Sequence, residues 1–317
     1  MKLPSERTYG YLLIAGLTLL LVATAGGAEP GIRFGKEVTK KYRFGFHIEA
    51  PAGSVTGIVA TMAVPMDWPE QTVKVVSEEI TPKCRVTYRN IDNGVKQMVV
   101  NIPRLAKGEE AGVEIIYEVT KREILAPEVT ADFVIPTKLN RDLQKLLLPS
   151  PYIESNDAQI KALAPQIIKD QTTAWDQSAA IFDWVRANVQ YKFAVEIKPA
   201  IAALKDKEGD CEELSSLFIA LCRANKIPAR AVWVPGHTYP EYYLQDAAGN
   251  GHWFPCQAAG AAREFGTMFE DRPILQKGDN FKVPEEKMPQ RYVKQFLKAA
   301  NAQADPVVKF IGERVKD

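Results

Sequence analysis

Near Pro127 the spacing of apolar residues changes from every second residue to the three- and four-residue spacing of helices. Before that point apolar and polar side chains alternate, most regularly over residues 42–48 and 113–119. Each alternating segment buries one face and leaves the other in water, so these segments must pair into covered sheets. The sequence therefore predicts an α+β protein, with an antiparallel β-sandwich over residues 30–136 and a second domain over 137–317 that includes a C-terminal extension.

The first half of the sequence contains a turn signal but no residue pattern that is typical of a catalytic or binding site. Asn93-Gly94 lies between the alternating segments 84–88 and 98–102, and this dipeptide favours the tight turn of a β-hairpin. His47 falls on the polar side of its strand, where a lone histidine is typical of a structural or solvated role.

After Pro127 the sequence predicts helices that are separated by helix-breaking glycines and prolines. Residues 256–286 have few periodic signals and several glycines and prolines, so they are expected to form an ordered wrap or loop. The helices are predicted over residues 139–148, 156–169, 175–189 and 288–301.

The N-terminus has the layout of a secretory signal peptide over residues 1–28. Lys2 and Arg7 precede an apolar run over residues 11–22, and small residues follow, with cleavage expected after Ala25 or Ala28. The run is shorter than the ~20 residues that cross a bilayer, which favours cleavage over the alternative of an uncleaved membrane anchor. We therefore expect a periplasmic or secreted protein, with membrane association only if the segment is retained.

Composition narrows the possible functions without choosing one. The 317 residues carry 40 Lys+Arg and 39 Asp+Glu, a net charge of +1, which gives no electrostatic argument for nucleic acid as a partner. With 46% apolar residues the chain is a folded globular protein rather than a disordered or multi-pass membrane protein. Four cysteines are too few for a disulfide scaffold, and no spacing of Cys, His or acidic residues predicts a zinc or calcium site. We expect no metal and no cofactor.

The most informative segment begins with Gly209-Asp210-Cys211. Leu214, Leu217 and the apolar residues that follow have helical spacing, and Asp210 is a favourable N-cap, so a helix is expected to begin at or just before Cys211. The amides of the first turn and the helix dipole favour a thiolate there and stabilise a developing oxyanion. The alternative is a buried, unreactive cysteine, as expected for Cys222 farther along the same helix.

A nucleophilic cysteine needs a base, and the second domain has two histidines. His252 borders a polar turn and is expected to be solvated, whereas His237 begins a strand and is the better candidate. Several charged residues are expected to be structural. Glu212 and Glu213 suit the first helical turn better than a role as catalytic acids. Arg230 suits an ion pair better than the binding of a substrate carboxylate, and Asp246 is a turn residue or an alternative acid.

Four motifs in this region resemble the transglutaminase-like superfamily. Residues 209–230 (GDCEELSSLFIALCRANKIPAR) are similar to its nucleophile helix and the following turn, with Lys226 where Gly is usual. His237-Thr-Tyr-Pro-Glu-Tyr-Tyr is similar to the His-Ala-Trp-x-Glu-x-Tyr strand, and Trp253-Phe-Pro-Cys-Gln257 to the Trp-x-Pro-x-Asp strand. The predicted helix around Trp184 is also similar to a helix of this superfamily.

The resemblance covers residues 175–260 and implies a papain-like fold with Cys211 as nucleophile and His237 as base. Gln257 stands where the family has its third catalytic residue, an aspartate. A glutamine can orient the imidazole by accepting its N–H, but it has no charge with which to stabilise an imidazolium.

Three hypotheses follow. The first is an exported cysteine peptidase, amidase or acyltransferase that acts on a protein or peptide through a thioester, with hydrolysis favoured over amine transfer. The second is a catalytically silent transglutaminase-like binding or scaffold protein of the cell envelope, which the replacement of the acid by Gln257 motivates. The third is a structural envelope protein that binds its partner through the sandwich alone.

Overall fold

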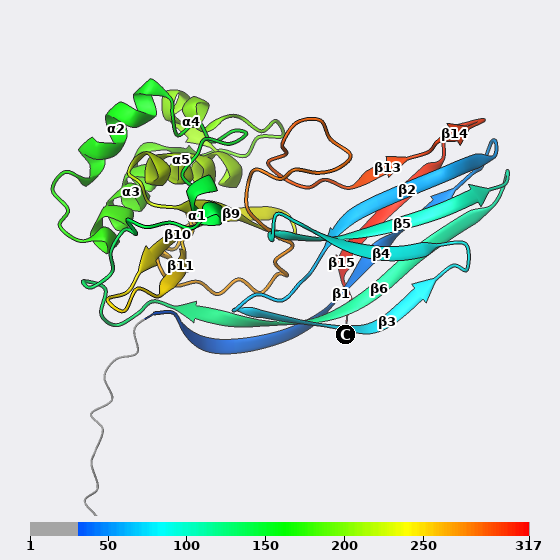
Figure 1. Ribbon diagram of the computed structural model, residues 1–317, viewed down its shortest axis with the longest axis horizontal. Coiled ribbons are helices and arrows are strands. Elements are labelled where there is room, and N and C mark those ends of the chain that lie inside the picture. Colours follow the sequence, from blue (N-terminus) through cyan, green and yellow to red (C-terminus); the bar gives the residue numbers. More distant parts are fainter. Residues whose placement is uncertain (1–30, 317) are drawn as a thin grey trace, which may run out of the picture.

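The computed structural model describes residues 31–316, so the predicted signal peptide and its cleavage sites lie outside the described residues. Figure 1 shows the helices gathered at one end of an elongated molecule and the long strands at the other. None of the helices among the described residues is long and apolar enough to cross a membrane. The α+β architecture predicted from the change of period is confirmed.

One layer of the sandwich is an antiparallel sheet in which the described strands run in the order β15-β1-β6-β3. Phe46 pairs with Val113 and Phe44 with Ile115, so the alternating residues of both segments share the buried face. This confirms the period-two prediction. The strands are β1 (Arg33–Glu49), β3 (Gln71–Ile80), β6 (Glu110–Leu125) and β15 (Val307–Arg314).

The second layer continues beyond the sandwich. Its described strands run in the order β11-β10-β9-β12-β5-β2-β13, and β12 pairs with β5 of the sandwich on one side and with β9 on the other. Asn93-Gly94 joins β4 and β5, as predicted. The strands are β2 (Val55–Val64), β4 (Arg85–Ile91), β5 (Val95–Leu105), β9 (Ala229–Val234), β10 (His237–Gln245), β11 (Gly251–Pro255), β12 (Gln276–Lys277), β13 (Phe296–Lys298) and β14 (Asn301–Ala302).

The helices pack on the part of this sheet formed by β9 and β10. Residues Leu217, Phe218 and Leu221 of α5 are fully buried against the other helices and the sheet, and so is Cys222, as predicted. The helices are α1 (Arg141–Lys145), α2 (Ala158–Ile168), α3 (Ala174–Asn188), α4 (Ala200–Asp206) and α5 (Cys211–Ala224), and the short strands β7 (Gln190–Tyr191) and β8 (Glu208–Gly209) pair in parallel.

The helix predicted over residues 288–301 is wrong. Phe296–Lys298 and Asn301–Ala302 instead form β13 and β14, which pair with β2. An unpaired strand edge offers a row of backbone hydrogen-bonding groups, and here that tertiary pairing outweighs the local helical pattern. β15 then pairs with β1, so the C-terminal residues return to the sandwich. The domain boundaries at 30–136 and 137–317 stay a prediction.

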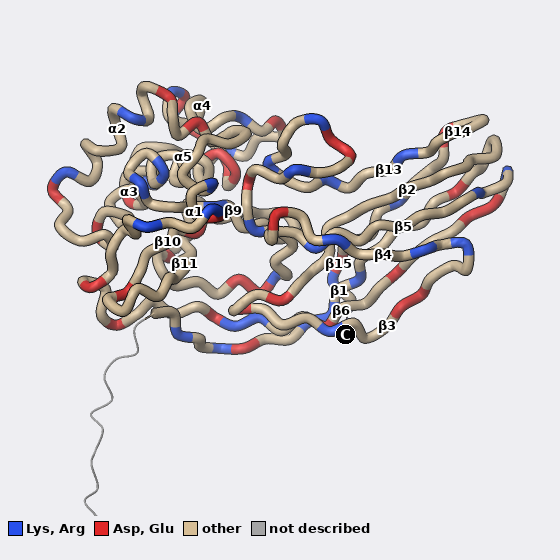
Figure 2. The backbone as a smooth tube through the Cα atoms, viewed as in Figure 1, with Lys and Arg blue, Asp and Glu red and all other residues tan. Residues whose placement is uncertain are grey.

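Buried charges join the two halves where the sheet is continuous. Lys277 on β12 lies 2.6 Å from Glu70, between β2 and β3, and 2.6 Å from Glu241 on β10, and all three side chains are at least 95% buried. Elsewhere Lys, Arg, Asp and Glu are interspersed along the chain (Figure 2). Because breaking such a buried pair leaves an uncompensated charge, the network fixes how the halves sit together.

Candidate active site

Cys211 is the first residue of α5, as predicted. The Asp210 side chain accepts a hydrogen bond from the Glu212 amide (2.7 Å), and Glu213 reaches back to the Asp210 amide (2.9 Å), forming a capping box. Glu213 also accepts from the Lys198 amide (2.7 Å). The predicted first-turn role of Glu213 is therefore what the structure shows, and these bonds hold the half-buried Cys211 at the helix N-terminus.

The resting thiol differs from the expectation of a stabilised thiolate. Burial raises the pKa of Cys211, a hydrogen bond with the Thr238 backbone lowers it, and the carboxylates of Asp210, Glu212 and Glu213 raise it further. The net direction is upward from the ordinary value. The cost of burying the thiolate and the three carboxylates at the start of the same helix outweigh the helix dipole.

His237 begins β10, and its neighbour Thr238 is the residue whose backbone contacts the Cys211 sulfur. His237 Nε2 lies 2.9 Å from Gln257 Oε1. Since an amide oxygen can only accept, Nε2 carries the proton and Nδ1 keeps its lone pair. Burial lowers the pKa of His237, the Gln257 bond raises it, and Arg272 lowers it, so the net shift is downward and favours the neutral imidazole.

The backbone around Gln257 is held on both sides. Its amide donates to the Glu264 carbonyl (2.8 Å), and its carbonyl accepts from Arg186 Nη1 on α3 (2.9 Å). The β10–β11 register pairs Glu241 with Pro255, and its extrapolation would place His237 opposite residue 259. In that register Gln257 shares the face of His237, whereas Cys256 is fully buried.

Arg272 and Glu270 also lie at the site, although no sequence pattern points to them. Arg272 forms a two-point ion pair with Glu270 through Nε (2.8 Å) and Nη2 (2.6 Å), and its Nη1 donates to the Pro235 carbonyl (3.2 Å). Pro235 lies two residues before His237, so the guanidinium supports the turn that carries the imidazole. Both residues lie in the region predicted as an aperiodic wrap, where no residue pattern pointed to them.

The other candidates have structural partners. Asp246 binds His252 Nε2 (3.0 Å) and the Asn250 amide (2.8 Å), which fits its predicted turn role. The side chain of His252 is mostly buried, which differs from the expected solvated position. It is buried because its ring binds Asp246 and packs against the ring of Phe133. Arg230 pairs with Glu241 (2.9 Å), as predicted.

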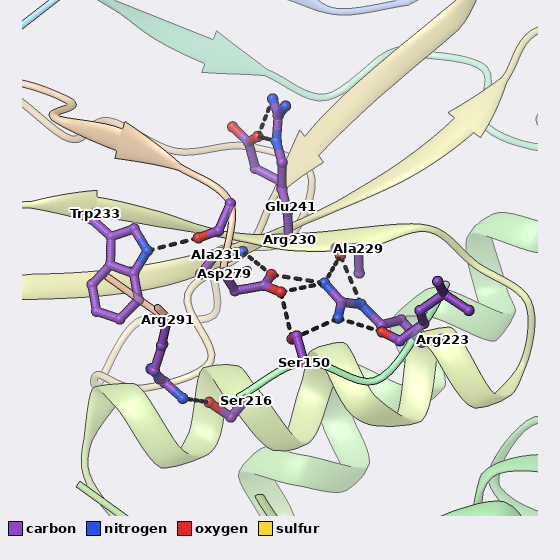
Figure 3. A network of polar contacts seen from close by, with 12 residues as sticks. Ser150, Ser216, Arg223, Ala229, Arg230, Ala231, Trp233, Glu241, Asp279 and Arg291 are labelled. Carbon is purple, nitrogen blue, oxygen red and sulfur yellow. Dashed lines mark hydrogen bonds and ion pairs between the residues drawn. The ribbon is translucent and has the colours of Figure 1, made fainter. Parts of the chain in front are cut away.

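A buried polar network fixes the opposite end of α5. Arg223 Nη2 lies 2.9 and 2.7 Å from the two carboxylate oxygens of Asp279, and Ser150 bonds to both residues (Figure 3). Nearer the first turn, Arg291 donates to Ser216 Oγ (2.6 Å; Figure 3). It also donates to the Glu212 carbonyl (3.0 Å). Helix α5 is thus anchored at both ends to the segment that follows β11.

Comparison with known proteins gives a family match and a similar fold. Residues 161–258 match the model of the transglutaminase-like superfamily. An uncharacterised protein of Haemophilus influenzae is 22% identical over 196 residues, which cover 59% of this chain and 53% of that protein, so the match spans about half the length of the relative.

Among the described residues no group of three or more His, Cys, Asp or Glu is placed to hold a metal ion.

Two solved structures are similar. A candidate cysteine protease from Cytophaga hutchinsonii matches with a TM-score of 0.57 and 17% identity, over 90% of this chain and 93% of that one. The periplasmic domain of TgpA from Pseudomonas aeruginosa matches with a TM-score of 0.33 and 14% identity, over 69% and 89% of the two chains. At 17% identity the first match shows a shared fold that includes the sandwich.

Proposed function

The chain belongs to the transglutaminase-like superfamily through residues 161–258, and we propose on that premise that it is an exported thiol enzyme acting on amide or peptide bonds. The observation that carries the proposal is the 2.9 Å bond between His237 Nε2 and Gln257 Oε1, which leaves Nδ1 as a base beside the residue that contacts Cys211. Cys211, His237 and Gln257 are the proposed catalytic residues, as nucleophile, base and orienting group.

The first step forms a thioester. His237 Nδ1 takes the thiol proton as Cys211 Sγ attacks the carbonyl carbon, and the backbone N–H of Cys211 helps to stabilise the negative charge on the carbonyl oxygen. The imidazolium returns its proton to the departing nitrogen, the C–N bond breaks, and the amine leaves. This proton shuttle fits the resting site, where burial favours the neutral forms of both the thiol and the imidazole.

The second step releases the acyl group. Water gives up a proton to the same imidazole, its oxygen adds to the thioester carbon, and the thiol leaves with the proton that His237 returns. An amine in place of water would give a new amide. We favour hydrolysis because water is abundant, so the proposed class is a cysteine peptidase or amidase, with a protein or peptide as substrate and acyl transfer as the variant reaction.

Hydrolysis of fluorescein-labelled casein by wild-type protein and by Cys211→Ala tests the proposal. We expect turnover to fall to background in Cys211→Ala and to persist in Cys84→Ala, which removes a buried sandwich cysteine. Adding dansylcadaverine separates the two outcomes, since transfer incorporates the amine and hydrolysis releases only peptides. Turnover that survives in Cys211→Ala, or its absence in the wild type together with no acyl-enzyme in the mass spectrum, overturns the proposal.

The alternative is a silent binding or scaffold protein, and Gln257 is the observation that favours it. A neutral amide cannot stabilise the imidazolium that forms during attack. Under this alternative the wild type is inert and Gln257→Asp gains turnover; under the proposed function the wild type is already active.

Export is part of the proposal and is supported by the N-terminal sequence pattern. The periplasm or the external medium is the proposed location, with a membrane-anchored form as the variant. The intact mass of the protein recovered from a bacterial periplasm tests this, since cleavage after Ala25 or Ala28 gives two distinct masses and an anchored form keeps the N-terminal segment.

A further inference from the structure

A cavity of about 260 Å³ lies on the face of β9 and β10 that points away from α5. Arg230 and Glu241, which line it, point to that side of the sheet (Figure 3). Its walls come from both halves of the molecule, and the surface open to the cavity is mostly apolar. Small-molecule sites are typically concave, mostly apolar and placed where domains meet, so the cavity has the form of a ligand site. The apolar walls are Ile32, Phe34, Pro69, Ile124 and Trp253.

The charged side chains that line this cavity already pair with one another. Lys277 lies 2.6 Å from both Glu70 and Glu241, and Arg230 lies 2.9 Å from Glu241. Both carboxylates are therefore balanced by cations of the protein. A cationic ligand would have to compete with these buried pairs, and it is disfavoured here.

Lys121 occupies a position where the sequence pattern calls for an apolar residue. Along β6 the buried side chains of Tyr117 and Val119 face the core, and Lys121 is the next residue on the same face. Lys121 is only 2% exposed, yet within residues 31–316 its ammonium forms no hydrogen bond or ion pair. Lysine is almost never fully buried unless it is paired, so this cation lacks an acceptor.

Lys121 lines a second cavity, of about 10 Å³, which shares the walls Glu70 and Ile124 with the larger one. One water molecule, or one oxygen atom of a ligand, fills a space of this size. Glu270 also lines the small cavity but already forms a two-point ion pair with Arg272. The carboxylates beside Lys121 are thus held by other cations.

The charges around the two cavities do not balance. Lys121, Lys277 and Arg230 face Glu70 and Glu241, and these five side chains sum to one positive charge. Burial lowers the pKa of Lys121 to about 8, Glu70 raises it, and Lys277 lowers it. The side chain is therefore still a cation at neutral pH, and an anionic acceptor would offset the cost of burying it.

We propose that the two cavities together bind a small apolar carboxylate. Its apolar body lies against Phe34 and Trp253 in the larger cavity, and one carboxylate oxygen enters the small cavity and accepts a hydrogen bond from Lys121. The ligand class is an aryl- or alkyl-carboxylate about the size of 3-phenylpropionate. Neither Cys211 nor His237 lines either cavity, so this inference is independent of the proposed function.

Saturation-transfer NMR titrations of the wild-type protein with phenylacetate, 3-phenylpropionate and 4-phenylbutyrate test the site. The three acids differ in the distance from ring to carboxylate, so the series covers the depth at which Lys121 lies. The matching amides keep the shape and the acceptor oxygen but lose the charge. We expect at least one acid to bind about tenfold or more tightly than its amide, the scale of a hydrogen bond between two charged groups. The cation 2-phenylethylammonium should not bind.

Lys121→Met is the decisive variant. Methionine has a similar shape and no charge, and removing an unpaired buried charge relieves its desolvation cost, so folding should be kept. We expect the preference for acid over amide to disappear. Phe34→Ala should instead weaken acid and amide alike, several-fold. The matched controls are Lys74→Met and Phe193→Ala, which change exposed residues that line neither cavity and should bind as the wild type does.

The inference is wrong if none of the three acids binds the wild type, or if acid and amide bind equally. It is also wrong if the acid preference persists in Lys121→Met with an unchanged melting temperature. Cys211→Ala should bind the acids with wild-type affinity, so a failed casein assay leaves this site in place and a failed titration leaves the catalytic proposal in place.

Discussion

His237 and Gln257 meet across the open end of the β10–β11 pair, with Nε2 2.9 Å from Oε1, although regular pairing of these strands ends at Glu241 and Pro255. The bond therefore depends on backbone contacts outside the sheet, namely Glu264 and Arg186 on either side of Gln257. It fixes the tautomer of a buried imidazole without bringing a charge to it. The pKa of His237 is thus set by burial, which lowers it, by the Gln257 bond, which raises it, and by the charges of Arg272 and Glu270.

Gln257→Asp should move the acid limb of the activity profile to higher pH. In the wild type the pKa of His237 lies below its ordinary value of 6.5, so the neutral base persists into mildly acidic solution. A carboxylate stabilises the imidazolium and raises that pKa, and the base form is then lost at a higher pH. The measurement is kcat/KM against pH.

Gln257→Ala is the companion variant. It removes the acceptor that fixes the tautomer, and kcat should fall by about 100-fold or more. A profile and a rate that match the wild type in both variants would show that Gln257 does not orient the imidazole.

Asp210→Asn should lower the pKa of the Cys211 thiol. Asp210 is among the carboxylates that raise that pKa, and asparagine caps a helix about as well as aspartate, so the charge is removed while the cap is kept. The rate of iodoacetamide alkylation against pH measures the shift. Asp210→Ala is the structural control, expected to lose about 1 kcal/mol of stability with the cap. An unshifted alkylation profile in Asp210→Asn would contradict the assigned electrostatics.

Arg272→Met should raise the pKa of His237 and slow the reaction. The guanidinium lowers the pKa of the imidazole, and Glu270, which raises it, loses its ion-pair partner in the variant, so both changes act in the same direction. The Pro235 carbonyl also loses its donor. Arg272→Lys keeps the charge and should restore the pH profile but not the two-point bond to Glu270. A merely structural role would reduce stability and leave the acid limb in place.

The sequence predicts an element correctly where a strong hydrophobic periodicity or a helix cap determines the local structure. The alternation around Phe46 placed β1, and the Asp210 cap with the leucine stripe placed the start of α5. The hairpin that carries His237 also followed from its turn residues. These features depend on neighbours within a few residues, and such neighbours are visible in the sequence.

Long-range partners account for what the sequence could not supply. Arg272 lies in a segment predicted only as a loop, and Arg186 in a segment predicted only as a helix. Neither local pattern indicates that the side chain contacts the site. The strand at Phe296–Lys298 exists because β2 has a free edge, and no residue within 288–301 encodes that edge. The raised pKa of Cys211 likewise depends on how much protein covers the thiol.

Asp246→Asn should destabilise the fold at neutral pH and have less effect in acid. The bond from His252 and those from Asn250 lower the pKa of Asp246 to about 2, below its unfolded value near 4. A depressed carboxyl pKa stabilises the fold above the unfolded pKa, here by about 2 kcal/mol, and this contribution is lost as pH falls from 4 to 2. Denaturant unfolding at pH 7, 4 and 3 measures it. A wild-type-to-variant difference that stays constant over this range would exclude the linkage.

Removing one partner of the Arg223–Asp279 pair should cost more stability than removing both. Each side chain is 1% exposed, and Arg223 also donates to the Ala229 and Leu148 carbonyls, so Asp279→Leu leaves a buried guanidinium without its counter-charge (Figure 3). We expect a loss of about 3–5 kcal/mol in the free energy of unfolding. The double variant Arg223→Met/Asp279→Leu removes both charges and should recover part of that loss.

Lys145→Met, which breaks an exposed pair with Asp142, is the control and should change stability by less than about 1 kcal/mol. Additive losses in the double variant would show that the two charges are not coupled.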